Sequence, residues 1–302
     1  MRANDALRKV GTANVWLAIG LDARTARPYT RRMTATTLSA PAPRTIALTR
    51  PFDWLAAGWR DFRRAPFIGV VHGLALSAFG LLLFTVARHH FWFLAGAFSG
   101  FLLIAPVLAV GLYAVSRALE RGEPVGFGLG WRTWLSWRGR ERHDWRLVRF
   151  GLLLALAGTG WVLTSASLIT LYAPAPIATP RDFLEHVVLA REGHLFEAWL
   201  ALGGVLAAPV FASSVVAIPL LLDREVGVLA AVFTSWRVVM DNPVAMALWA
   251  GLIMGLTLLG MASLMLGLAI VVPWLAHASW HAYRDLLPRD GMRVPAAPSG
   301  PH

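Results

Sequence analysis

Long stretches without any charged residue dominate the pattern of this 302-residue chain. Four of them, at 65–87, 91–116, 150–173 and 198–222, have 23 to 26 residues each. At about 1.5 Å per residue, each is long enough as a helix to cross a bilayer core of about 30 Å. A fifth stretch, 243–283, has 41 residues and would measure about 61 Å as one helix, about twice that thickness. The pattern therefore predicts a reversal at the Gly- and Ser-containing segment 260–267, with spans at 243–260 and 266–283.

The segments outside these spans have a more polar pattern. Residues 52–64 form one helical stripe of large apolar side chains, which are Phe52, Leu55, Trp59 and Phe62. Such a helix next to a span is typical of one that lies flat at the level of the lipid headgroups, the alternative being a soluble amphipathic helix packed on a loop. A second amphipathic helix, on the cytoplasmic side, is predicted near 226–240. We expect residues 1–48 to be a basic, disordered extension and residues 288–302 to be a disordered tail.

The predicted fold class is all-α: a six-helix transmembrane bundle in 49–287 with an N-terminal interfacial amphipathic helix. Composition agrees, because 57% of the residues are hydrophobic and 15% are charged, whereas soluble domains have about 25% charged residues. This composition excludes an ordinary soluble enzyme, a disordered chain and a coiled coil. The chain has no cysteine, which excludes disulfides, thiolate metal sites and a cysteine nucleophile.

The distribution of charge predicts the orientation of the bundle. Residues 1–64 carry 12 basic and 4 acidic side chains, and the loop 117–149 carries 8 and 4. The loop 174–197 carries 2 basic and 4 acidic side chains. Basic excess near span ends marks the cytoplasmic face, so both termini are expected inside and 174–197 outside. The same rule accounts for the net charge of +11 without nucleic-acid binding.

Glycine pairs four residues apart occur in three of the spans, at Gly69/Gly73, Gly96/Gly100 and Gly251/Gly255. Small residues at this spacing allow two helix backbones to approach closely. We expect these pairs to mediate packing within one protomer rather than a dimer face.

Candidate chemistry is confined to a few histidines, because no Asp, Glu, Lys or Arg lies within the six spans. Ion-coupled transporters usually place a charged residue at membrane depth, so this absence argues against that class. His72 is the ionisable side chain deepest in a span. His277 and His281, four residues apart on one helical face, could offer two imidazoles to one metal ion. The interpretation we prefer is an interfacial aromatic belt that includes Trp274, Trp280 and Tyr283.

Several long strings resemble the DUF2189 family of uncharacterised bacterial integral membrane proteins. They are WLAAGWRDF at 54–62, FLLIAPVLAVGLYAVSRALERGEP at 101–124, IPLLLDREVGVLAAVFTSWRVVMDNPVAMALWAGLI at 218–253 and LGLAIVVPWLAHASWHAYRDLL at 266–287. The resemblance covers about 45–287 and implies a membrane location but no established activity or ligand. Because it begins near residue 45, we hypothesise that translation starts at Met33 rather than Met1.

We therefore expect a multi-pass protein of the bacterial cytoplasmic (inner) membrane that is not an enzyme. A structural or assembly role ranks first, a permease for a small or lipid-like solute second, and a haem- or metal-binding redox subunit third. The expected partners are the lipid bilayer and either further copies of the chain or other membrane proteins, with no nucleic acid. No catalytic residue and no cofactor are predicted, and His72, His277 and His281 are weak metal candidates.

Overall fold

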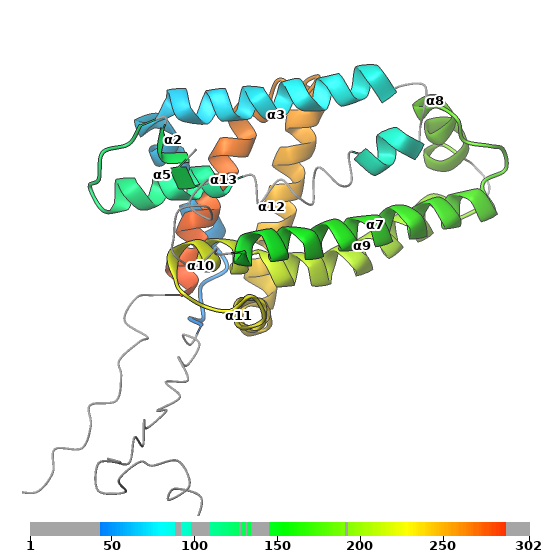
Figure 1. Ribbon diagram of the computed structural model, residues 1–302. Coiled ribbons are helices and arrows are strands. Elements are labelled where there is room, and N and C mark those ends of the chain that lie inside the picture. Colours follow the sequence, from blue (N-terminus) through cyan, green and yellow to red (C-terminus); the bar gives the residue numbers. More distant parts are fainter. Residues whose placement is uncertain are drawn as a thin grey trace, which may run out of the picture. The chain divides into compact units, whose positions relative to one another are not determined.

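The computed structural model describes residues 43–87, 92–97, 109–126, 128–130, 132–133, 145–190 and 193–287, which contain helices and no strand (Figure 1). The helices are α2 (Arg50–Arg64), α3 (Pro66–Ala87), α5 (Val110–Glu120), α7 (Arg146–Tyr172), α8 (Pro180–Phe183), the π-helix η1 (Leu184–Val188), α9 (Leu195–Ser214), α10 (Ala217–Asp223), α11 (Val228–Asp241), α12 (Pro243–Ala262) and α13 (Leu268–Leu286). The all-α class predicted from the sequence is confirmed for these residues. The two predicted disordered ends, 1–48 and 288–302, lie almost entirely outside them, as does the Met33 start.

Four stretches among the described residues are long and apolar enough to cross a membrane: Pro66–Val86, Arg146–Tyr172, Leu195–Asp223 and Pro243–Ala262. They correspond to four of the six predicted spans. The middle of the second predicted span, 91–116, lies outside the described residues, which include only 92–97 and 109–116 of it. The sixth, 266–283, forms α13, which is not among the four apolar stretches. The described residues thus form helices without a strand, and they contain four candidate spans.

Helix α13 is the helix around which the others pack, and it contacts α2, α3, α5, α10 and α12. Small side chains make the closest of these contacts possible. A Cβ atom on Gly58 of α2 would lie 2.5 Å from the backbone nitrogen of Ala278, and one on Gly73 of α3 would overlap the backbone of Ala269. The Gly69/Gly73 pair therefore packs within the protomer, as predicted. Gly251 and Gly255 face open space instead, with nothing within 4 Å of a built Cβ.

The predicted reversal between the last two apolar segments is present at residues 263–267. Helix α12 ends at Ala262 and α13 begins at Leu268, so residues 263–267 connect the two helices at one end of the pair (Figure 1). The Ser263 hydroxyl accepts a hydrogen bond from the Gly267 amide at 2.8 Å. Leu264 and Met265 adopt positive φ values of 54° and 67°, which is uncommon for residues with a side chain. The reversal therefore depends on Ser263 capping as well as on glycine.

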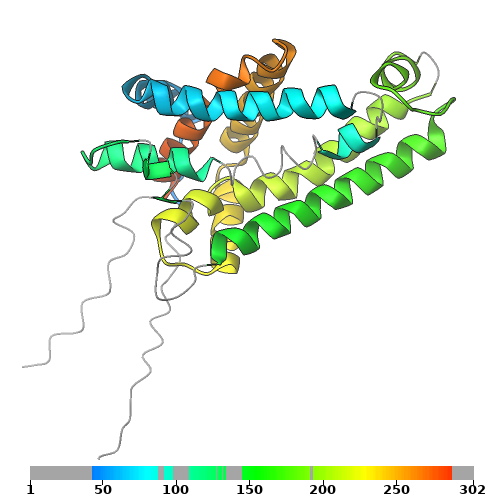
Figure 2. The same cartoon turned by 45° about the horizontal axis from the view of Figure 1, so that its top comes forward.

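Helix α7 and helix α9 lie side by side in both views (Figures 1 and 2). One face of α7 is buried, whereas large leucine side chains on its other face are exposed, namely Leu152, Leu156, Leu163 and Leu171. An exposed leucine row on an apolar helix suits contact with lipid tails or with another membrane protein.

Helix α11 forms where the second amphipathic helix was predicted, but its exposed face carries large apolar side chains beside Arg237 and Asp241. It buries Ala231, Thr234, Ser235 and Val238 against neighbouring helices. Leu229, Phe233 and Met240 are exposed. The buried side is small and weakly polar because α11 packs closely on α9 and α10, so the large apolar side chains point outward.

Candidate functional site

The C-terminal half of α13 carries most of the polar side chains that contact other helices, and we take it as the candidate site. Its first part, the Asp61 cluster, consists of Asp61, Ser116, His277 and His281 from α2, α5 and α13. The Asp61 carboxylate accepts hydrogen bonds from the Ser116 hydroxyl at 2.8 Å and from His281 Nε2 at 2.7 Å. Ser116 Oγ also lies 2.8 Å from His277 Nδ1. Asp61, Ser116 and His277 are buried, and His281 is partly exposed.

The hydrogen bonds of the Asp61 cluster assign the imidazole tautomers. Ser116 has one hydroxyl proton and donates it to Asp61, so His277 Nδ1 must carry the hydrogen that it shares with Ser116. His277 Nε2 is then a buried acceptor, and it has no hydrogen-bond partner within the described part of the chain. His281 holds its donor hydrogen on Nε2, toward Asp61.

The pKa of Asp61 lies below its ordinary value. Burial alone would raise the pKa of this carboxyl. The hydrogen bond and the charge of His281, the Ser116 hydroxyl and the nearby His277 together lower the pKa by more than burial raises it. Asp61 is therefore held as a carboxylate in a buried position, where an unpaired charge would be costly.

This arrangement does not activate Ser116 as a nucleophile. A catalytic serine passes its proton to a neighbouring imidazole, whereas Ser116 donates to a carboxylate and is itself buried. The cluster therefore links α2, α5 and α13, and its hydrogen bonds place the protons on Ser116 Oγ, His277 Nδ1 and His281 Nε2.

The three histidines predicted as metal candidates have different places in the structure. His277 and His281 both reach the Asp61 cluster, but through separate partners, Ser116 for His277 and Asp61 for His281. His72 lies on α3, close enough to His277 to affect it electrostatically. Among the residues that the structure describes, no group of three or more His, Cys, Asp or Glu side chains is arranged to hold a metal ion. These residues do not form the expected interfacial aromatic belt, whose side chains would face the membrane surface, because His277, Trp280 and Tyr283 are fully buried in the protein.

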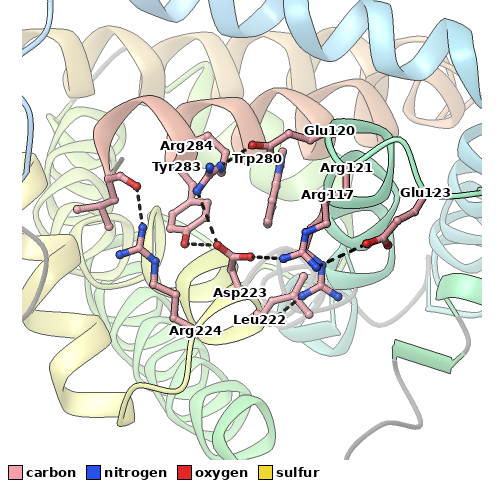
Figure 3. A network of polar contacts seen from close by, with 11 residues as sticks. Arg117, Glu120, Arg121, Glu123, Leu222, Asp223, Arg224, Trp280, Tyr283 and Arg284 are labelled. Carbon is pink, nitrogen blue, oxygen red and sulfur yellow. Dashed lines mark hydrogen bonds and ion pairs between the residues drawn. The ribbon is translucent and has the colours of Figure 1, made fainter. Parts of the chain in front are cut away.

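The second part of the site, the Asp223 cluster, is centred on the carboxylate at the end of α10 (Figure 3). Asp223 accepts a hydrogen bond from the Tyr283 hydroxyl at 2.8 Å. Arg121, the residue that follows α5, donates to the other oxygen of Asp223 at 3.4 Å, and Arg284 of α13 lies 3.8 Å away. One carboxylate thus joins α5, α10 and α13.

Glu120, next to Arg121 on α5, extends this cluster along α13 (Figure 3). It accepts a hydrogen bond from the indole of Trp280 at 3.1 Å and one from Arg284 at 3.0 Å. Arg224 donates to the carbonyl of Leu287 at 2.9 Å, which ties α10 to the end of α13. Buried aromatic groups and charged groups are therefore both used to hold the same helix.

A third part anchors the first turns of α2 and the segment that precedes this helix. Asp285 accepts hydrogen bonds from Arg50 at 2.8 Å and from the Trp54 indole at 2.9 Å. Burial alone would raise the pKa of Asp285. These two hydrogen bonds and the charge of Arg50 lower the pKa by more than burial raises it, so it lies below its ordinary value. The side chain of Asn242, just before α12, bonds both the amide of Ile46 and the carbonyl of Arg44.

Sequence reasoning singled out His277 and His281 but none of their partners. Asp61, Ser116 and Asp223 lie 220, 161 and 60 residues from the α13 residues that they contact. A usable signal was present, because the charged and polar residues of 277–285 recur at helical spacing within an otherwise apolar helix.

Comparison with known families adds one finding. A family model described as "Predicted integral membrane protein (DUF2189)" matches residues 93–223. This segment of the chain is therefore similar to the DUF2189 family. The match confirms the resemblance over these residues and leaves the remainder of 45–287 as a prediction. No curated protein and no solved structure matches the chain.

The DUF2189 segment contains only one side of the candidate site. Ser116, Glu120, Arg121 and Asp223 lie inside 93–223, whereas α2 and α13 lie outside it. The site therefore forms only when segments before and after the matched region pack against it.

Proposed function

We propose that this integral membrane protein is a non-enzymatic structural or assembly component of the bacterial cytoplasmic (inner) membrane. One observation carries the proposal: the carboxylates of the candidate site are shared between helices that are distant in sequence. Asp61, Asp223 and Asp285 each bind side chains from another helix, and each of them contacts α13 or is part of it. Charged groups used in this way fix helix positions rather than bind a substrate.

We further propose six spans with both termini in the cytoplasm. The excess of basic residues in 1–64 and 117–149 supports this orientation. The reversal at 263–267 supports an even number of crossings, because it returns the chain toward the end of the bundle that holds α2.

The exposed face of α7 is where we expect another membrane protein to bind. Leu152 is 70% exposed, whereas Leu154, two residues later, is 4% exposed. A structural component has to contact its assembly through such a face. Lipid alone would cover the face in a protein that acts by itself.

Photo-crosslinking in intact membranes tests this proposal. A photoreactive amino acid at Leu152, Leu156 or Leu163 should give a discrete protein adduct, either with a second copy of the chain or with another membrane protein. The same group at the buried Leu154 should give no such adduct and serves as the control. Lipid adducts alone at all three exposed positions would contradict the structural role.

A permease is the second candidate, and a break in one apolar helix favours it. The candidate span Leu195–Asp223 consists of α9 and α10, which are separated at Val215 and Val216. The amide of Val216 bonds the Ser235 hydroxyl of α11 at 3.2 Å, outside the regular helix pattern. Interrupted helices form substrate sites in many transporters.

Solute flux separates the two candidates. Purified protein in sealed vesicles should release trapped small solutes no faster than protein-free vesicles if its role is structural. Flux that needs the protein and that changes in Ser235→Ala would favour the permease.

A further inference from the structure

The outward face at the end of α2 carries a compact group of basic and aromatic side chains. Arg60, Arg63 and Arg64 are exposed there, together with Trp59 and Phe67. The opposite face of α2 packs on α13 through Trp54, Leu55 and Phe62. We call the exposed group the α2 arginine patch.

The position of the patch along the chain sets its depth in a membrane. Helix α2 ends at Arg64, Ala65 departs from helical geometry with φ −132° and ψ 52°, and the apolar α3 begins at Pro66. The Phe62 ring covers Gly69 of α3, where a Cβ atom would lie 2.8 Å from the ring. The bend is therefore fixed by packing. It holds the arginines within six residues of the start of a candidate span, at the level of the headgroups.

The positive charge of the patch is largely uncompensated by the protein. Among the residues that the structure describes, no carboxylate forms an ion pair with Arg60 or Arg63. Arg64 lies 4.0 Å from Asp61, but that carboxylate is buried and already binds Ser116 and His281. The patch thus presents three guanidinium groups within about one helical turn.

Aromatic contacts give independent support for an interfacial position. Trp59 is 37% exposed, and its ring packs against Phe62 and Trp274 with centroids 5.3 Å apart in both pairs. The Trp274 indole bonds the carbonyl of Leu55 at 2.7 Å. Anchored tryptophan side chains with an exposed edge are typical of the boundary between lipid tails and headgroups.

We propose that the α2 arginine patch binds the phosphate groups of anionic phospholipids in the leaflet that contains α2. Guanidinium groups match phosphate oxygens in geometry and charge. Trp59 lies beside the arginines on α2, Phe67 follows them at the start of α3, and both exposed rings would contact the acyl-chain boundary. Arginine at a helix C-terminus also stabilises the helix dipole, but that role needs no lipid and is not selective for headgroup charge.

Native mass spectrometry of the full-length protein in mild detergent tests this proposal. The parent is titrated with phosphatidylglycerol and, separately, with zwitterionic phosphatidylcholine. The variant Arg60→Gln/Arg63→Gln/Arg64→Gln removes the patch. The control Arg44→Gln/Arg132→Gln/Arg181→Gln removes three exposed arginines that lie nine or more residues from the candidate spans. Circular dichroism and gel filtration check the fold of each protein.

Each arginine near an anionic surface should contribute roughly five-fold in affinity. We expect the patch variant to lose phosphatidylglycerol affinity by on the order of 100-fold and the control variant to keep the parent affinity within about five-fold. Phosphatidylcholine binding should be weak in all three proteins. Replacing the patch with three lysines keeps the charge but loses the guanidinium geometry, so the affinity of this variant should lie between those of the parent and the glutamine variant.

Three results would overturn the proposal. The first is an equal loss of phosphatidylglycerol affinity in the patch and control variants. The second is equal binding of both lipids by the parent. The third is displacement of phosphatidylglycerol by millimolar inorganic phosphate, which would indicate a site for a free anion. If the triple variant fails to fold, Arg60→Gln/Arg63→Gln leaves the contact of Arg64 with Asp61 intact. We expect this double variant to lose on the order of 20-fold.

Discussion

The contact between Asp61 and His281 gives the sharpest test of how the candidate site stabilises the fold. We consider Asp61→Asn, which removes the negative charge, and His281→Leu, which removes the donor. The two side chains meet at 2.7 Å, and the Asp61 side chain is 7% exposed whereas that of His281 is 29% exposed. Because one partner is buried and the other is partly solvated, the coupling should lie below that of a fully buried ion pair.

The magnitude follows from the hydrogen bonds that each change removes. A hydrogen bond to a charged group contributes about 1.5–3 kcal/mol to stability. We expect Asp61→Asn and His281→Leu each to lower the free energy of unfolding by about 2 kcal/mol. The double variant should lose about 1.5 kcal/mol less than the sum, because either single change already breaks the contact. His281→Gln keeps a donor near the Nε2 position and should cost less than His281→Leu.

Equilibrium unfolding in mixed micelles measures these free energies. Sodium dodecyl sulfate is titrated into protein in a mild detergent at pH 7, and tryptophan fluorescence and circular dichroism follow the transition. The exposed pair Arg181–Glu185, also 2.7 Å apart, is the control, and its coupling should fall within the error of the measurement. Additive losses for Asp61→Asn and His281→Leu, within about 0.3 kcal/mol, would refute the assignment of this contact.

Two further predictions concern packing and pH. Gly73→Ala should lower the free energy of unfolding by about 1–3 kcal/mol, because its Cβ would overlap the backbone of Ala269. Gly251→Ala is the control and should cause no loss, because this position faces open space. The same unfolding assay measures both variants, and equal effects would contradict the packing of α3 on α13. The pKa values of Asp61 and Asp285 are lowered in the folded protein. The stability that these carboxylates contribute is therefore fully present above the unfolded pKa of about 3.9, and it is lost as the pH falls through the lower folded pKa values. Between pH 7 and pH 3, the free energy of unfolding should fall less in Asp61→Asn than in the parent, and identical pH profiles would contradict the shift.

The sequence was most informative where one physical requirement acts locally. Uncharged runs of more than 20 residues predicted α3, α7, the α9–α10 stretch and α12, because few other structures keep such runs away from water. The reversal between α12 and α13 followed from length alone, since one helix over 243–283 would be too long for a bilayer.

The candidate site depended on contacts that no local pattern contains. His277 and His281 were noticed for their spacing, but their hydrogen-bond partners are far away in the sequence: Ser116 is 161 residues from His277, and Asp61 is 220 residues from His281. The apolar stripe predicted for α2 was also incomplete, because Phe52 is exposed and Trp54 is buried against Trp249. Which face of an amphipathic helix is buried depends on the neighbours that cover it, and those neighbours are set by the whole fold.

Accessibility of single cysteines tests most directly whether the α13 site lies at the cytoplasmic end of a membrane bundle. The chain has no natural cysteine, so each introduced thiol reports one position. Glu123 and Glu225 are exposed near the Asp223 cluster, and His194 is exposed in the loop predicted outside. In intact bacterial cells, a membrane-impermeant maleimide should label His194→Cys, and it should label Glu123→Cys and Glu225→Cys only after lysis. Labelling of Glu225→Cys in intact cells, with His194→Cys protected, would contradict the orientation on which this account of the site depends.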